Sequence, residues 1–210
     1  MTADHAELLH QLGRSHARLA ETLAGLTDSQ ARQPSRLPGW SRGHVATHLC
    51  RNADAIRRLA LGVLSREPAE MYPGGPDARN AAIEEGAGRP ASLLAADHDF
   101  AGSRALATLR LLPEDALDTP VRWRKPVAAR DLVTLRWREV EIHHLDLDLG
   151  HTPADWPAEF VAATLTTELP ALKEAVGDVA VPELPDHEVL AWLVGRPTRP
   201  DLPEIPSWPF

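Results

Sequence analysis

The amino-acid sequence predicts a mainly α-helical protein, a four-helix bundle followed by a small α/β domain. Apolar residues, mostly leucines, recur at helical spacing in four separate segments. Prolines and glycines gather in the connections between these segments and toward the C-terminal end. One of the connections is long, as in bundles that contain a crossover. We expect the bundle to span residues 1–152 and the smaller domain residues 153–210.

Composition narrows the possible partners and the compartment. The chain has 30 acidic and 22 basic residues, a formal charge of −8, and no basic run interleaved with aromatic residues, so neither nucleic acid nor a membrane is an expected partner. The single cysteine, Cys50, excludes an internal disulfide framework and fits a reducing compartment. No apolar run approaches the length of a membrane span, and no signal-peptide core is apparent. We therefore expect a cytoplasmic protein.

The first two predicted helices are joined by a loop. A leucine stripe predicts a helix over residues 3–26, and His16 lies close to that stripe, where a lone histidine is usually a packed core residue. Residues 27–40 are rich in proline, serine and glycine and predict a loop. Ser41 is a good N-cap residue and predicts the start of a second helix that runs to residue 67.

The second predicted helix carries two histidines that could bind a metal. His44 and His48 are four residues apart and could form a metal-binding pair. The helical wheel favours His48 as the inward member, because it borders the apolar stripe, whereas His44 lies nearer the edge. Asn52 falls inside the stripe. Cys50 is predicted to point away from the core, and we reject it as a ligand or nucleophile.

The next part of the chain is predicted to be mostly connection. Residues 66–90 contain Pro-Gly and Gly-X-Gly breaks and two arginines, Arg79 and Arg89, and long loops are often functional. Residues 91–112 predict the third helix. Residues 121–128 predict a short extended segment before the last helix of the bundle.

The last bundle helix, residues 131–150, has polar groups on its inward face. Glu139 and His143 lie one turn apart near the middle of that face, where polar groups are costly unless they are paired or bound to a metal. They could present two ligands from one helical face. The alternative is a core histidine satisfied by a hydrogen bond to the glutamate. The residues predicted on the solvent side are Arg138, Glu141 and Asp148.

Beyond Gly150 the sequence changes character. Residues 157–174 predict a helix interrupted at Pro170. Residues 179–184 resemble a short strand. Residues 186–195 predict a helix capped by Asp186, which a proline-rich tail follows.

Two motifs carry a resemblance to a known family. Residues 35–54 (SRLPGWSRGHVATHLCRNAD) together with residues 138–150 (REVEIHHLDLDLG) resemble the mycothiol-dependent maleylpyruvate isomerases, which belong to the DinB-like metalloenzyme superfamily. Residues 83–90 (IEEGAGRP) and 192–197 (WLVGRP) are also similar to that family. The resemblance is weakest over residues 155–180, and the C-terminal region is short for the family.

The resemblance implies a fold and a metal site. The fold is a DinB-like four-helix bundle with a small C-terminal α/β domain. The cofactors are a divalent metal, usually Zn²⁺, and mycothiol, a low-molecular-weight thiol. The implied metal ligands are His48, Glu139 and His143, which the helical wheels had also placed inward. Asp146 matches an acidic residue of the family and is expected either to orient an imidazole or to be a solvated or capping acid.

The resemblance also implies the reaction, the isomerisation of maleylpyruvate to fumarylpyruvate in gentisate-type aromatic degradation. We expect the metal to deprotonate the thiol, whose addition to the cis double bond allows rotation before elimination. The dicarboxylate substrate requires cationic groups. Arg196 is the candidate catalytic residue, and Arg79, Arg89 and Asn52 are candidates for substrate binding.

Two other functions fit the same residues. Another DinB-like thiol-dependent transferase would keep the metal and the thiol but attack a different electrophile. A non-catalytic metal-binding regulatory module would keep only the bundle and the metal. In each case we expect a monomer or a weak homo-oligomer.

Overall fold

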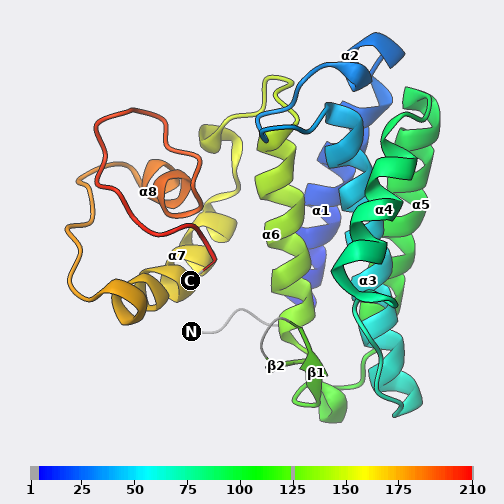
Figure 1. Cartoon of the computed structure of the whole chain (residues 1–210). Coiled ribbons are helices and arrows are strands. Elements are labelled where there is room, and N and C mark those ends of the chain that lie inside the picture. The colour runs from blue at the N-terminus through cyan, green and yellow to red at the C-terminus, as the bar shows by residue number, and fades with distance from the viewer. Residues whose placement is uncertain (1–4, 124–125, 210) are drawn as a thin grey trace. The chain divides into compact units, whose positions relative to one another are not determined.

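The computed structural model describes residues 5–123 and 126–209. The chain divides into two compact units, Met1–Leu149 and Gly150–Phe210 (Figure 1). In the described residues, no helix is both long enough and apolar enough to cross a membrane.

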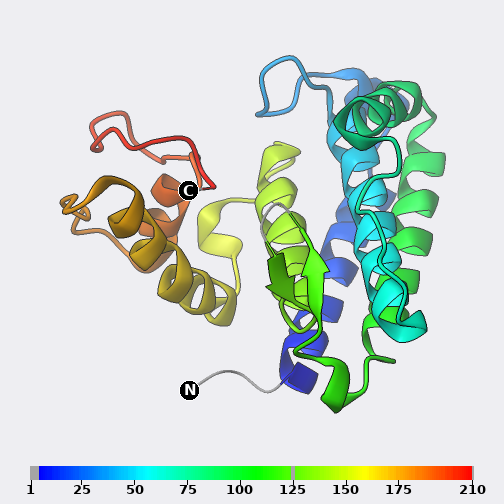
Figure 2. The ribbon, with the colours of Figure 1, turned by 60° about the horizontal axis from the view of Figure 1, so that its bottom comes forward.

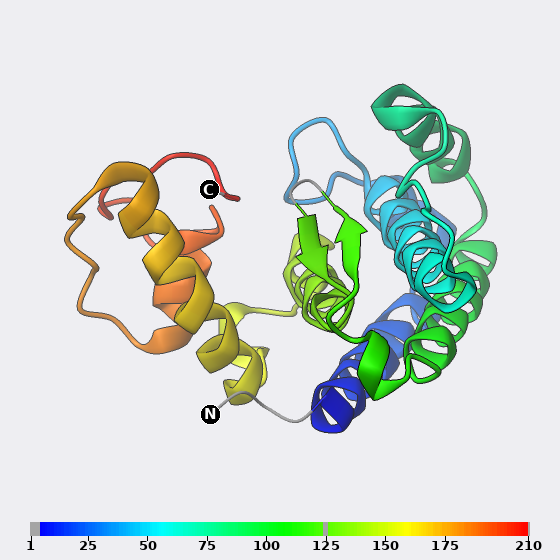
Figure 3. The same ribbon diagram turned by 90° about the horizontal axis from the view of Figure 1, so that it is seen from below.

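Four long helices form the first unit. They are α1 (His5–Ala24), α3 (Arg42–Ser65), α5 (Ala91–Leu109) and α6 (Asp131–Asp146). Both α1 and α3 pack against α5 and α6, so the four helices enclose one core, which Figure 3 shows from one end of the bundle. The predicted mainly α-helical bundle is confirmed. Its largest fully buried side chains include Leu19, Leu49, Ile56, Leu94, Leu132 and Trp137.

The start of α3 is fixed by a capping box. The Ser41 hydroxyl accepts a hydrogen bond from the backbone N–H of His44, and Nδ1 of His44 accepts one from the backbone N–H of Ser41. The prediction of Ser41 as the N-cap is confirmed. The cap fixes where α3 begins, and further along the same helix His48 contacts Glu139 of α6.

Two short helices lie where the sequence predicted connections. Residues 27–40 contain α2 (Asp28–Arg32), and residues 66–90 contain α4 (Gly75–Ala87), which packs against α3. The prediction that residues 66–90 are mostly connection was wrong over Gly75–Ala87. The Pro-Gly residues read as breaks are start signals, because Gly74 adopts a left-handed conformation at the N-cap and Pro76 occupies the first turn.

A two-stranded hairpin precedes α6. Strand β1 (Pro120–Arg122) pairs antiparallel with β2 (Pro126–Ala128), as Figure 2 shows. The extended segment predicted over 121–128 is therefore two strands, and residues 124–125 within it lie outside the described residues. A 3-10 turn, η1 (Glu114–Ala116), joins α5 to the hairpin.

Cys50 is buried rather than directed away from the core. The side chain is fully inaccessible and packs with Ala53 of α3 and with Ala101 and Ala105 of α5. Burial raises the pKa of the Cys50 thiol to about 12. The prediction of its direction was wrong because α3 is covered on a second side by α5. A buried, protonated thiol is unreactive.

Glu141 is also buried, against the prediction that it faces solvent. Its side chain is only 1% exposed and lies against α1. Arg18 Nη2 donates to Glu141 Oε1 at 2.6 Å, and the Ser15 hydroxyl donates to the same oxygen. Burial raises the pKa of Glu141 against these stabilising contacts. Helix α6 therefore buries polar groups on two faces, one toward α3 and one toward α1.

The second unit has two helices and no strand among its described residues. Helix α7 (Ala158–Val176) continues through Pro170 without the predicted interruption, and a 3-10 turn, η2 (Pro153–Asp155), precedes it. Residues 179–184 are irregular, so the predicted strand and the α/β class of this unit were wrong. Helix α8 (Asp186–Leu193) begins at Asp186 itself, after Pro185 at the N-cap, so Asp186 does not cap it.

Candidate metal centre

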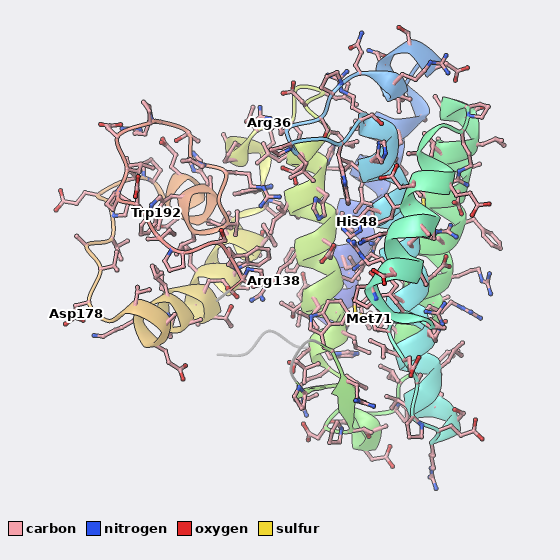
Figure 4. All side chains as sticks on the ribbon, in the orientation of Figure 1. Arg36, His48, Met71, Arg138, Asp178 and Trp192 are labelled. Atoms are coloured by element: carbon pink, nitrogen blue, oxygen red, sulfur yellow. The ribbon has the colours of Figure 1, made fainter. Side chains whose placement is uncertain are left out.

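Helices α3 and α6 bring His48, Glu139 and His143 together. Oε2 of Glu139 lies 2.9 Å from Nε2 of His48 and 3.5 Å from Nε2 of His143, and the two Nε2 atoms are 3.1 Å apart. Figure 4 shows His48 between the two helices. All three residues were expected from the sequence, and the structure places His48 of α3 beside Glu139 and His143 of α6. Among the described residues, these three are the set of His, Cys, Asp and Glu side chains close enough to share a metal.

The spacing of the three atoms fits a divalent metal. Ligand atoms about 2.0–2.2 Å from a tetrahedral Zn²⁺ lie roughly 3.4 Å from one another. The observed separations of 2.9, 3.1 and 3.5 Å bracket that value. Two imidazole nitrogens and one carboxylate oxygen are ligands that suit zinc and related transition metals, and a fourth position would stay open.

Asp146 orients His143. Oδ2 of Asp146 accepts a hydrogen bond from Nδ1 of His143 at 2.8 Å, and Asp146 has no exposed surface. An imidazole that donates from Nδ1 keeps the lone pair of Nε2 directed at the other two residues. Burial acts to lower the pKa of His143, but the nearby carboxylates of Asp146 and Glu139 outweigh burial and raise the pKa.

The carboxylate of Glu139 is held in its charged form. Burial acts to raise its pKa, but the hydrogen bonds to His143 and His48 outweigh burial and place the pKa well below the usual range. A charged carboxylate beside two imidazoles is the protonation state that a metal site requires.

His48 is neutral and nearly inaccessible. It is 5% exposed, and burial is the main cause that lowers its pKa to about 4. The ring of Trp40 lies 5.7 Å from the His48 ring and 6.2 Å from that of His44. Nη2 of Arg79, from α4, lies 3.1 Å from Nδ1 of His48.

His44 does not join the site. Its Nδ1 takes part in the capping box with Ser41, and its Nε2 lies 3.2 Å from a carboxylate oxygen of Glu84. Of the two histidines on α3, only the one predicted to face inward reaches α6.

The predicted substrate-binding residues have different surroundings. Arg79 reaches His48, as described above. Arg89 forms an ion pair with Asp97 at 2.8 Å and donates to the carbonyl of Gly86, so the structure gives no support to its predicted role. Asn52 is 1% exposed, and its Oδ1 accepts a hydrogen bond from Arg136. A role for Asn52 in binding substrate stays a prediction.

Arg136 is a buried cation that the sequence analysis did not single out. It lies on α6 one turn before Glu139 and is 2% exposed. Its Nη1 donates to the carbonyl of Leu49 at 2.9 Å and to Oδ1 of Asn52 at 2.8 Å. Burial lowers the pKa of Arg136 to about 10, so it stays charged at neutral pH. It therefore adds positive charge near Glu139 of the metal centre.

Two aromatic residues near the centre were also missed. Tyr72 lies in the connection before α4, with the guanidinium of Arg79 5.7 Å from its ring centroid, and burial raises its pKa. Trp40 was part of a quoted motif but was given no role. Its position directly before the N-cap Ser41 was a usable signal, because a residue there packs back on the first turns of the helix.

Arg196 belongs to the second unit. Its backbone N–H donates to the carbonyl of Ala191 at 2.7 Å, and its Nη1 donates to the carbonyl of Val194 at 2.6 Å. These bonds tie Arg196 to the end of α8. Its catalytic role stays a prediction.

The fold and the site define a helical-bundle protein with a candidate divalent-metal centre between two of its helices. The family model of the mycothiol maleylpyruvate isomerase N-terminal domain matches residues 12–148, which include all three candidate ligands. The chain belongs to this family. The search of curated proteins found no match.

Two solved structures share the fold. A crystal structure of the mycothiol-dependent maleylpyruvate isomerase aligns with a TM-score of 0.82 at 24% identity, over 98% of this chain and 97% of that chain. A mutant of such an isomerase, with alanine in place of a histidine, aligns with a TM-score of 0.81 at the same identity and coverage. At 24% sequence identity, the similarity to these two structures shows a shared fold. The coverage also corrects the expectation that the C-terminal region is short, because nearly all of each chain aligns.

Proposed function

We propose that this protein is a mycothiol-dependent isomerase that converts maleylpyruvate to fumarylpyruvate. The observation that carries the proposal is the convergence of His48, Glu139 and His143 on one point, in a chain of this family. The route would be gentisate-type degradation of aromatic compounds, as the family resemblance implies. The protein would act in the cytoplasm, as its composition led us to expect, as a monomer or a weak homo-oligomer.

The three converging residues would hold one divalent metal ion, for which Zn²⁺ is our proposal. When bound, such an ion lowers the pKa of a coordinated thiol, and the resulting thiolate supplies a nucleophile whose reversible addition turns a cis double bond into a rotatable single bond. No oxidation or reduction is needed, which suits zinc.

The residues of the chain prepare the site for this chemistry. Asp146 keeps the lone pair of His143 available, and the low pKa of Glu139 keeps its carboxylate charged at neutral pH. With two neutral imidazoles and one carboxylate, a divalent ion keeps a net positive charge, which favours binding of an anionic sulfur. The buried guanidinium of Arg136 adds to that positive potential.

The test is an isomerisation assay on zinc-loaded protein with mycothiol supplied or withheld. We expect conversion of maleylpyruvate only when both zinc and mycothiol are present. Conversion without the thiol would contradict the mechanism. Thiol binding without isomerisation would favour another thiol-dependent transferase, and zinc binding with no thiol affinity would favour a non-catalytic module.

A further inference from the structure

Helix α5 carries a row of exposed apolar side chains. The three most exposed large apolar side chains of the described residues are Leu93, Phe100 and Leu111, at 54%, 61% and 67%. Leu93 lies seven residues before Phe100, and Leu111, in the turn that follows α5, lies eleven residues after it. These separations are close to two and three helical turns, so the three side chains share one side of the helix. We call this surface the α5 face; it consists of Leu93, Ala96, Phe100, Ser103, Ala107 and Leu111, all of them exposed.

The core contacts of α5 come from its other side. Helix α5 packs on α1 and α3 (Figure 3). Leu94, Ala101, Ala105 and Leu109 are buried there. The α5 face is left at the surface of the bundle. Single exposed leucines are ordinary, but several large apolar side chains gathered on one face indicate an interaction surface.

Charged residues border the α5 face in a definite order. Asp97 and Arg104 are seven residues apart and lie on one flank, and Asp99 and Arg110 are eleven residues apart and lie on the other. On each flank, the acidic residue is in the N-terminal half of the helix and the arginine in the C-terminal half. In an antiparallel pair of such helices, each acid faces toward the arginine on the same flank of the second copy. A parallel pair would bring acids together and arginines together, which is unfavourable.

One two-fold axis suits the apolar residues as well. Leu93 and Leu111 have the same midpoint in the sequence as Phe100 and Arg104, namely residue 102. An axis at that level places Leu93 beside Leu111 of the second copy and Phe100 beside its Arg104. Within one chain, the guanidinium of Arg104 already lies 4.9 Å from the centroid of the Phe100 ring. The second copy offers this ring another cation.

We propose that the α5 face binds the α5 face of a second copy of this chain, with the two helices antiparallel. In such a two-fold dimer, the commonest assembly of soluble proteins, the same patch serves both copies. Asp97 is already held by Arg51 and Arg89 of its own chain at 2.7 and 2.8 Å. Asp99 and Arg110 therefore supply most of the charge attraction. This inference goes beyond the proposed function, because it needs neither metal, thiol nor substrate.

The first experiment is disulfide cross-linking of the full-length protein through introduced cysteines. The natural Cys50 is fully buried and does not interfere. Ser103→Cys lies beside the axis, so we expect a covalent dimer under mild oxidation on a non-reducing gel. In Ala96→Cys, the two cysteines of an antiparallel pair are about 18 Å apart at 1.5 Å per residue, so this variant should not cross-link. Equal cross-linking of both variants would contradict the antiparallel arrangement, and no cross-linking of Ser103→Cys would overturn the dimer.

The second experiment is analytical ultracentrifugation over a range of protein concentrations. We expect a monomer–dimer equilibrium for wild type and a Kd at least about tenfold higher for Phe100→Glu, because dimerisation would bury the new charge. Val181→Glu is the control, since it makes a similar change at an exposed apolar residue of the second unit, and its Kd should equal that of wild type. A wild-type protein that stays monomeric up to about 1 mM would overturn the proposal.

Charge reversal tests the orientation of the two helices. Asp99→Arg and Arg110→Asp each place like charges across the interface, and we expect each to raise the Kd of the dimer about three- to tenfold. The double variant restores opposite charges and should dimerise as wild type does. A double variant that dimerises no more tightly than either single variant would overturn the antiparallel pairing.

Alkylation of Ser103→Cys distinguishes a dimer from a cover supplied by the chain itself. We expect the introduced thiol to be alkylated rapidly in dilute, monomeric protein and more slowly as the dimer forms. Slow alkylation at every concentration would mean that the same chain covers the α5 face, and this would overturn the proposal. None of these measurements uses enzymatic activity, so the dimer and the proposed function can fail separately.

Discussion

The carboxylate of Asp146 accepts a hydrogen bond from His143 at 2.8 Å and is completely buried at the end of α6. Asparagine in its place offers a weaker, neutral acceptor. We therefore expect Asp146→Asn to weaken zinc binding about 10- to 100-fold, as loss of an outer partner of a metal ligand usually does. Chelator competition measures this affinity.

Asp148→Asn is the matched control, because it makes the same chemical change two residues away. Asp148 is exposed, and its left-handed backbone conformation is one that asparagine also tolerates. Its zinc affinity should stay within about twofold of wild type by the same criterion. Equal zinc affinities for the two variants would show that Asp146 does not orient His143.

Gly102 of α5 gives the His16 ring its room. A Cβ at this position would lie 2.0 Å from Cε1 of His16, so the ring would have to move. We expect Gly102→Ala to lower the free energy of unfolding by about 1–3 kcal/mol, which is the usual cost of adding atoms to a well-packed core. Urea denaturation measures it. Gly88→Ala is the control, because a Cβ added there would have no atom within 4 Å and the φ of −84° suits alanine. Equal effects of the two substitutions on the free energy of unfolding would refute the steric explanation.

His16 makes the stability of the fold sensitive to acid. Burial is the main cause that lowers its pKa to about 4 in the folded chain, from 6.5. The unfolded chain binds the proton more readily, so its contribution is complete above pH 6.5 and is lost as the pH falls toward 4. This loss amounts to about 3 kcal/mol by pH 4.

The check is the free energy of unfolding of the metal-free protein from pH 7 to pH 4. We expect His16→Leu to flatten this pH dependence. His98, whose ring centroid lies 4.6 Å from that of His16 and whose pKa is also lowered, retains part of it. A variant whose stability falls with pH as steeply as that of wild type would exclude His16 as a source of acid sensitivity.

Arg196 is the predicted catalytic cation. We expect Arg196→Ala to bind zinc as wild type does but to lose about 100-fold or more in kcat/KM, as removal of an electrostatic contact to the reacting group does. Steady-state kinetics on zinc-loaded protein measures this. Arg199→Ala, which removes an exposed arginine paired with Glu188, is the control. Wild-type turnover of Arg196→Ala would remove Arg196 from the site.

The sequence predicted the bundle and the polar pair of α6 because both depend on local periodicity. Glu139 and His143 share one face of one helix, so their spacing was enough to place them together. His48 could be expected to face inward, but only the resemblance to a family connected it with the pair. The distance between α3 and α6 depends on packing, which a helical wheel does not contain.

The errors arose where a helix has more than one buried face. Glu141 lies opposite the apolar stripe of α6, but Ser15 and Arg18 of α1 reach it there. Cys50 lies on the far side of α3, but α5 covers that side. A wheel with a single inward direction assigns such residues to solvent. The irregular segment 179–184 was misread for a different reason. A strand needs a pairing partner, and Pro182 has no N–H to donate to one.

The most direct test of the metal centre is the zinc content of three proteins after equilibrium dialysis. We expect one zinc per chain for wild type and for His44→Ala, whose imidazole is used in the helix cap, and none for His48→Ala. One zinc per chain in His48→Ala would contradict a metal centre shared between α3 and α6.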